Sequence, residues 1–369
     1  MNGIKQKFKP KHQVLILKCY PRLPKNSSAA EIKPNGSELS YLLFYASSRR
    51  SKLTKVGTFL EKRTTSDLYK SRSSSVQITL QILTAFLNNP GIGGGGPEGF
   101  GLFAPFVLRI LRDVLKSAND TALVEYAVPT WDSFCRHQDH VALSADLEYR
   151  SLFAEVVRLW AGYATKEQGN KKPAARGQMR VGVTDSIKLR SAGLQALKSV
   201  ADSDSLGTEA GRQLDTVMPV VLQNVYGSDA EFKYLLKMQS QSEAFEKEKA
   251  AKPGRPSMAA GRSTFDNGDV RAAEGTTAEA DKLADEEASV LALQVLKSIF
   301  AVENRQQTRS ATTCVLRFVT TQSPSASSEK MSGRDLDSAW SITLFETVCN
   351  WTPVQDRFCL LYTSPSPRD

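Results

Sequence analysis

The chain has 369 residues, 41% hydrophobic and 24% charged, a composition typical of soluble globular proteins rather than of disordered or membrane-spanning ones. This length exceeds what one hydrophobic core usually organises, which predicts two domains or an elongated array. The formal net charge is +9, but residues 1–72 alone carry +12, so the other 297 residues carry −3. Because the basicity is local, it predicts a surface that meets an anionic partner.

The cysteines and the apolar runs indicate a compartment. Five cysteines are far apart and form no C-x-x-C pair, and the N-terminus lacks an apolar signal region: Cys19, Cys135, Cys314, Cys349 and Cys359. This pattern predicts a reducing, cytosolic environment. The apolar-rich run 76–87 is shorter than the about 20 residues that a membrane-spanning helix needs, so no membrane span is expected.

In chain order, residues 1–36 are predicted to form an extended basic arm with a short helix at 11–19, which Pro21 and Pro24 end. Amphipathic helices then follow, because apolar residues recur at helical spacing, as at Val76, Leu80, Leu83 and Leu87. Their predicted ranges are 37–46, 51–68, 76–87, 103–116, 121–137, 145–165, 185–201, 209–226, 228–248, 283–303, 306–321 and 333–350.

The connections between these helices are of two kinds. Residues 88–101 and 169–182 contain Gly and Pro and are predicted loops, whereas residues 252–281 have too little apolar surface to order and are predicted to be disordered. Pairs of helices without a convincing strand predict an all-α fold, an α-solenoid of HEAT or armadillo type. A compact helical bundle is the alternative. The predicted parts are 1–36, 37–250, a linker at 251–282, 283–358 and a tail at 359–369.

The second of these helices carries a basic face. Lys52, Lys55, Lys62, Arg63 and Lys70 fall within an arc of about 100° on a helical wheel, and the arm from Lys5 to Arg22 adds charge of the same sign. We therefore predict an anion-binding surface, whose partner is an anionic membrane or a nucleic acid; a solvated charged face is the plain alternative.

Acylation would give this surface a second anchor. Cys19 lies between Lys18 and Arg22 and is the predicted acylation site. The alternative is that Cys19 packs as a small apolar residue under the first helix.

The motifs of catalysis are missing. Gly94, Gly96 and Gly99 match G-x-G-x-x-G, but they follow a helical pattern and enclose a proline, which indicates a plain loop. Cys135, His137 and His140 are too few for a zinc site and are interpreted as a polar helix end. Signatures of nucleophilic, metalloprotease and P-loop chemistry are absent from the sequence. We expect no enzymatic activity, no cofactor and no metal.

Several short motifs point to a known family. They are PKHQ at 10–13, CYP at 19–21, SYLLFYA at 40–46, RRSKL at 49–53, KLRSAGL at 188–194, VMP at 217–219 and WTPVQDR at 351–357. Together they resemble the Eighty-five-requiring, or rolling blackout, family in its fungal form. The resemblance implies a helical-repeat scaffold on the cytosolic face of the plasma membrane, which recruits the phosphatidylinositol 4-kinase complex through a tetratricopeptide-type adaptor.

The resemblance also implies that the basic N-terminal surface binds acidic phospholipids, including phosphoinositides. The predicted lipid-binding residues are Lys5, Lys7, Lys9, Lys11, Lys18, Arg22, Arg49, Arg50, Lys52 and Lys55. Animal members carry an acylated cysteine cluster at the extreme N-terminus that this sequence lacks, so more of the anchoring is expected from charge. A helical-repeat nucleic-acid or transport adaptor is the alternative function.

The C-terminal residues depart from the family pattern after Phe358. Residues 359–369 resemble translated adapter sequence, and members of the family are much longer. We therefore expect an incomplete protein with a non-native tail, without the adaptor-binding tail of the family.

Overall fold

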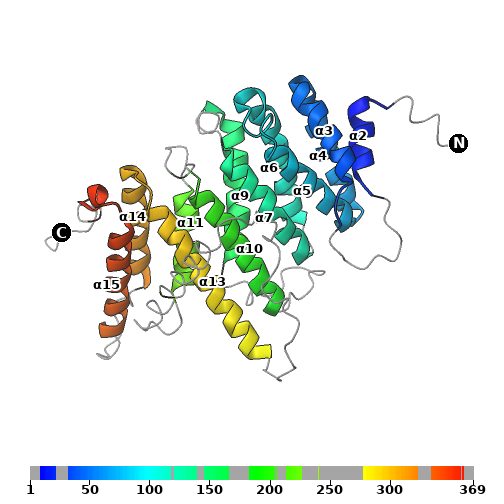
Figure 1. The fold of residues 1–369 in the computed structure, drawn as a ribbon. Helices are drawn as coiled ribbons and strands as arrows, with labels where there is room; N and C mark the ends of the chain where they lie inside the picture. The colour runs from blue at the N-terminus through cyan, green and yellow to red at the C-terminus, as the bar shows by residue number, and fades with distance from the viewer. Residues whose placement is uncertain are drawn as a thin grey trace. The chain divides into compact units, whose positions relative to one another are not determined.

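A computed structural model describes residues 9–21, 32–117, 120–138, 145–165, 183–203, 206, 213–226, 240, 277–322, 334–358 and 360. These residues form twelve α-helices and three short 3-10 helices, and no strand (Figure 1). The predicted all-α fold is thereby confirmed for the described residues. The chain divides into two compact units, residues 1–159 and residues 160–369.

The first unit contains the 3-10 helices η1 (Arg50–Lys52) and η2 (Gly96–Glu98). Its α-helices are α2 (Lys11–Cys19), α3 (Gly36–Ser48), α4 (Leu53–Tyr69), α5 (Ser73–Leu87), α6 (Phe100–Ser117), α7 (Thr121–Arg136) and most of α9 (Leu147–Ala164). α4 packs on α6 and α5 packs on α7, so helices two apart in the chain are neighbours, as in stacked helix pairs.

Helix α5 forms the centre of this unit. It has no charged residue and packs against α3, α4 and α7. Apolar side chains on several of its faces are therefore buried. The predicted core residues Val76, Leu80, Leu83 and Leu87 are all buried. Around them aromatic rings stack, with 5.1 Å between the ring centres of Phe86 and Phe103. The predicted periodicity of this helix is confirmed.

The second unit contains the end of α9 and the 3-10 helix η5 (Val354–Asp356). Its other α-helices are α10 (Val183–Ala201), α11 (Leu214–Val225), α13 (Thr277–Phe300), α14 (Arg305–Gln322) and α15 (Arg334–Trp351). α10 packs along α13, as Figure 1 shows, and an ion pair between Arg190 and Asp285 joins them. α11 packs against both α13 and α14.

Two observations bear on the predicted parts. α10 packs on α13, and α11 packs on both α13 and α14, so helices of the predicted 37–250 part contact helices that follow the predicted linker. The predicted linker 251–282 overlaps α13, which begins at Thr277. Its first residues are mostly polar and Ala, so apolar periodicity does not reveal them. The rest of that linker, the loop at 169–182 and the helix at 228–248 lie almost wholly outside the described residues.

The core face of α15 also differs in part from prediction. Trp340, Leu344 and Val348 are buried as expected, and Trp340 meets the ring of Tyr226 edge-on at 5.0 Å. Phe345 was expected beside them, but it is only half-buried and lines a shallow surface groove. Thr343 and Thr347 of the same helix are buried instead, and the Thr347 hydroxyl donates to the Thr343 carbonyl at 2.7 Å.

Candidate functional site

Helices α2 and α3 form an antiparallel hairpin that positions the basic residues of the N-terminus. Asn35, which precedes α3, donates its side-chain amide to the Lys18 carbonyl at 2.6 Å and its backbone N–H to the Cys19 carbonyl at 2.9 Å. These bonds satisfy carbonyls at the end of α2 that have no partner within the helix. They also place the start of α2 beside the end of α3, and α2 packs on α4 as well.

Two cations enclose an aromatic ring where the start of α2 meets the end of α3. Lys11 Nζ lies 5.5 Å from the centre of the Tyr45 ring and 5.6 Å from that of Tyr41. Arg49 Cζ lies 5.9 Å from the centre of the same Tyr45 ring. All three distances are within cation–π range. Tyr45 is buried, so these contacts hold the two exposed cations on one side of the hairpin.

Two further lysines extend this positive surface. Lys52 ends η1 and Lys55 lies in the first turn of α4. Burial lowers the pKa of His12 on α2, and the charges of Lys55 and then Lys52 lower this pKa further. Because both charges act on His12, the two lysines lie near α2. We call Lys11, Arg49, Lys52 and Lys55 the basic cluster.

The members of the basic cluster have no ion-pair partner among the described residues. Two other predicted lipid-binding residues do, since Lys18 Nζ lies 3.7 Å from Glu38 and Arg50 Nη1 lies 3.4 Å from Glu98. Lys9 is exposed just before α2. Lys5, Lys7 and Arg22 lie outside the described residues. Seven of the ten predicted cations therefore lie among the described residues of the N-terminal region, and of these only Lys18 and Arg50 are in ion pairs there.

Arg63 was predicted in the basic arc of α4, and the structure corrects this. Its guanidinium stacks 3.7 Å above the Tyr20 ring, and Nε lies 3.5 Å from a carboxylate oxygen of the buried Asp67. The side chain is only 22% exposed. Tyr20 in turn shares a 2.8 Å hydrogen bond with Thr79. Arg63 therefore fastens the end of α2 to α4 and contributes little free charge. Asp67, four residues after Arg63, was the available signal for this pairing.

Cys19, the predicted acylation site, is buried. Its thiol donates to the Leu15 carbonyl at 3.3 Å. Burial, and secondarily the charge of Glu38, raises the pKa of this thiol to about 12. Because the thiolate is the reactive form of cysteine, this environment disfavours acylation in the folded chain. The position matches the alternative, a small residue packed under the first helix, and acylation stays an untested prediction.

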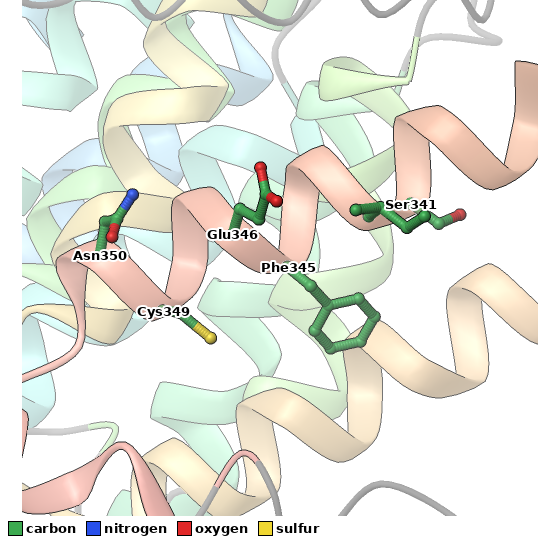
Figure 2. A pocket seen from close by; sticks show the side chains of 6 residues that line it. Ser341, Phe345, Glu346, Cys349 and Asn350 are labelled. Carbon is green, nitrogen blue, oxygen red and sulfur yellow. The ribbon is translucent and has the colours of Figure 1, made fainter. Parts of the chain in front are cut away.

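Two surface grooves are candidates for small ligands. One, of about 250 Å³, runs between α2 and α4 beside the basic cluster and is lined by His12, Gln13, Thr54, Lys55, Thr58, Phe59 and Lys62. The other, of about 550 Å³, lies on α15, where Figure 2 shows Phe345, Glu346 and Cys349 among its lining side chains. The α15 groove brings together no acid–base or nucleophilic set of groups.

The remaining sequence motifs occupy ordinary structural positions. The glycine-rich run lies in the connection between α5 and α6, which consists of turns and η2; it follows a helix and not the strand that the dinucleotide motif requires. Cys135 is buried near the end of α7. Across the described part of the chain, no group of three or more His, Cys, Asp or Glu side chains is placed to hold a metal ion. Helices in the same part are too short or too polar to cross a bilayer.

Comparison with known proteins places these observations in context. A family model described as EFR3 protein matches residues 11–212. The chain is 42% identical to Protein EFR3 of Coccidioides immitis and 39% identical to that of Gibberella zeae, over 98% of its own length in each case. It spans only 28% and 31% of the length of those two relatives.

A solved structure has a similar fold. The crystal structure of Efr3 matches 96% of this chain and 51% of its own, with a TM-score of 0.59 and 23% identity. This likeness supports the all-α helical-repeat fold.

Proposed function

The chain belongs to the EFR3 family, and on that premise we propose that it is part of a peripheral scaffold on the cytosolic face of the plasma membrane. In this proposal the basic N-terminal surface binds acidic phospholipids, and the whole protein recruits the phosphatidylinositol 4-kinase complex through a tetratricopeptide-type adaptor. The observation that carries the lipid-binding part is the basic cluster, four exposed or half-exposed cations without ion-pair partners among the described residues.

In this proposal the charge of the basic cluster supplies the electrostatic part of membrane attachment. Each Lys or Arg near an anionic leaflet contributes about 1 kcal/mol, so four such residues contribute about 4 kcal/mol, or about three orders of magnitude in affinity. Paired cations such as Lys18 and Arg50 contribute less, because their charge is already partly neutralised. The attraction acts within about 8 Å at physiological salt, so binding should weaken as salt rises.

In this proposal the adaptor and the kinase bind a part of the longer protein that this chain does not include. The chain spans less than a third of the two relatives compared above, and the family resemblance associates the adaptor with a C-terminal tail. We therefore propose that this chain supplies the membrane-facing end and that the adaptor binds a region beyond the matched part. An adaptor pull-down with the longer protein, and its loss when residues after the matched part are removed, would test this assignment.

Vesicle co-sedimentation tests the lipid-binding part. A variant with Lys11, Arg49, Lys52 and Lys55 each changed to Glu should lose binding to phosphatidylserine or phosphoinositide vesicles by at least about three orders of magnitude at low salt, because each change removes an attractive charge and adds a repelled one. The matched control changes four exposed cations elsewhere in the chain to Glu, none of them in an ion pair among the described residues, namely Arg158, Lys188, Arg309 and Arg357, and should stay within a few-fold of wild type. Circular dichroism verifies that both variants fold.

Two results would contradict this function. Undiminished vesicle binding by the basic-cluster variant would remove the cluster from the interface. Binding to nucleic acid with a steep salt dependence, together with no binding to anionic vesicles, would favour the nucleic-acid adaptor instead.

A further inference from the structure

The outward face of α3 lacks charge altogether. Its exposed residues are Gly36, Ser37, Ser40, Tyr41, Phe44 and Ser48, and the only charged residue of the helix, Glu38, is half-buried and faces Lys18. Phe44 is 68% exposed and Tyr41 is 48% exposed. Water-facing helix surfaces usually carry charged side chains. This face instead presents an aromatic pair between small polar residues.

The aromatic pair is contiguous with the basic cluster. Tyr41 and Phe44 are three residues apart, so their side chains are neighbours on one helix face. Lys11 Nζ lies 5.6 Å from the centre of the Tyr41 ring, and Arg49 follows the last residue of α3. Aromatic residues beside free cations are the composition of helices that lie in the interface of anionic bilayers.

Electrostatic attraction by itself leaves attachment dependent on salt, and the buried Cys19 thiol is poorly placed to add a lipid chain. We propose that Tyr41 and Phe44 insert into the interfacial region of the anionic bilayer that the basic cluster attracts, and so supply the apolar part of the attachment. This inference rests on the proposed lipid binding. Charge complementarity between the flanking cations and the headgroups selects a bilayer as the occupant of this face.

Salt separates the apolar contribution from the electrostatic one. At about 1 M salt the Debye length falls to about 3 Å, so the remaining vesicle affinity should come mainly from the aromatic pair. Changing Tyr41 and Phe44 to Ser should lower this affinity about tenfold or more. The matched control is Tyr69→Ser, because Tyr69 is 89% exposed at the opposite end of α4 from the basic cluster. This control should leave the affinity unchanged.

Insertion depth gives a second, independent measurement. In a Phe44→Trp variant, lipids brominated on their acyl chains should quench the new fluorescence when vesicles are added, whereas a Tyr69→Trp variant should show no added quenching. The four native tryptophans, of which Trp131 and Trp160 are fully buried, contribute a background that the wild-type chain measures directly. Quenching of Phe44→Trp alone, with the loss of affinity in the serine variant, supports insertion.

Failure of the inference is distinguishable from failure of the proposed function. If wild type binds anionic vesicles, but the serine variant keeps full affinity at high salt and Phe44→Trp is not quenched, insertion is refuted and charge-driven binding stands. If wild type does not bind anionic vesicles, both fail. Capture of a protein by this face without vesicle quenching would likewise overturn the inference.

Discussion

The substitution Gly193→Ala tests how closely α9 and α10 approach. A Cβ atom at position 193 would lie 2.6 Å from the backbone N of Ala164, 2.9 Å from the carbonyl O of Trp160 and 3.0 Å from Cα of Ala164. Favourable contacts between such atoms are at about 3.5–4.0 Å. All three neighbours belong to the backbone, so no side chain can rotate away. The two helices would have to separate by several tenths of an ångström.

The size of the effect follows from two opposing terms. Replacing Gly by Ala inside a helix stabilises it by about 0.8–1.0 kcal/mol, whereas forcing an extra carbon into a packed contact costs typically about 1–3 kcal/mol and sometimes more. We expect overpacking to outweigh the gain in helix propensity, because three backbone atoms lie within 3.0 Å of the new carbon. The free energy of unfolding should fall overall, by up to about 2 kcal/mol.

Gly162 offers a matched control two residues before Ala164. It also lies inside α9, but an added Cβ would meet nothing within 4 Å. Gly162→Ala should therefore raise the free energy of unfolding by up to about 1 kcal/mol. Urea unfolding followed by far-UV circular dichroism measures both variants. If Gly193→Ala proved as stabilising as Gly162→Ala, the close backbone contact between α9 and α10 would be wrong.

Three further predictions concern buried polar groups. Burial lowers the pKa of His12 in the folded chain, so as pH falls below about 6.5 the unfolded chain takes up a proton before the folded chain does, and stability decreases as the pH is lowered. His12→Gln should lessen this acid loss, as urea unfolding at about pH 7 and about pH 5 would reveal. An unchanged loss would exclude His12 as a source. Burial raises the pKa of the Cys19 thiol to about 12, so this thiol should react with a maleimide only after unfolding. Equal labelling in native buffer and in urea, measured by mass spectrometry, would contradict its burial. Asn224 donates to the Ala164 carbonyl at 2.8 Å, so Asn224→Ala should cost about 1–3 kcal/mol in the same urea assay, and a neutral result would show that the bond is dispensable.

Local sequence patterns predicted the helices well. The run with Val76, Leu80, Leu83 and Leu87 became α5 with all four residues buried, because a helix that buries one face must repeat apolar residues at its own period. Helix starts were less predictable. α13 begins at Thr277, before its first apolar positions, since a polar turn can extend a helix without changing the periodic pattern.

The sequence by itself determined that the N-terminal region is basic, that the chain is helical and which family its motifs resemble, because composition and short-range periodicity are properties of neighbouring residues. Only the tertiary structure decided which charges are free. Arg63 and Lys55 look alike in the sequence, yet Arg63 stacks on Tyr20 from another helix, while Lys55 has no ion-pair partner among the described residues. Arg50 likewise meets Glu98, 48 residues away. Such pairings depend on contacts between segments distant in the chain, and packing brings those segments together only in the folded protein.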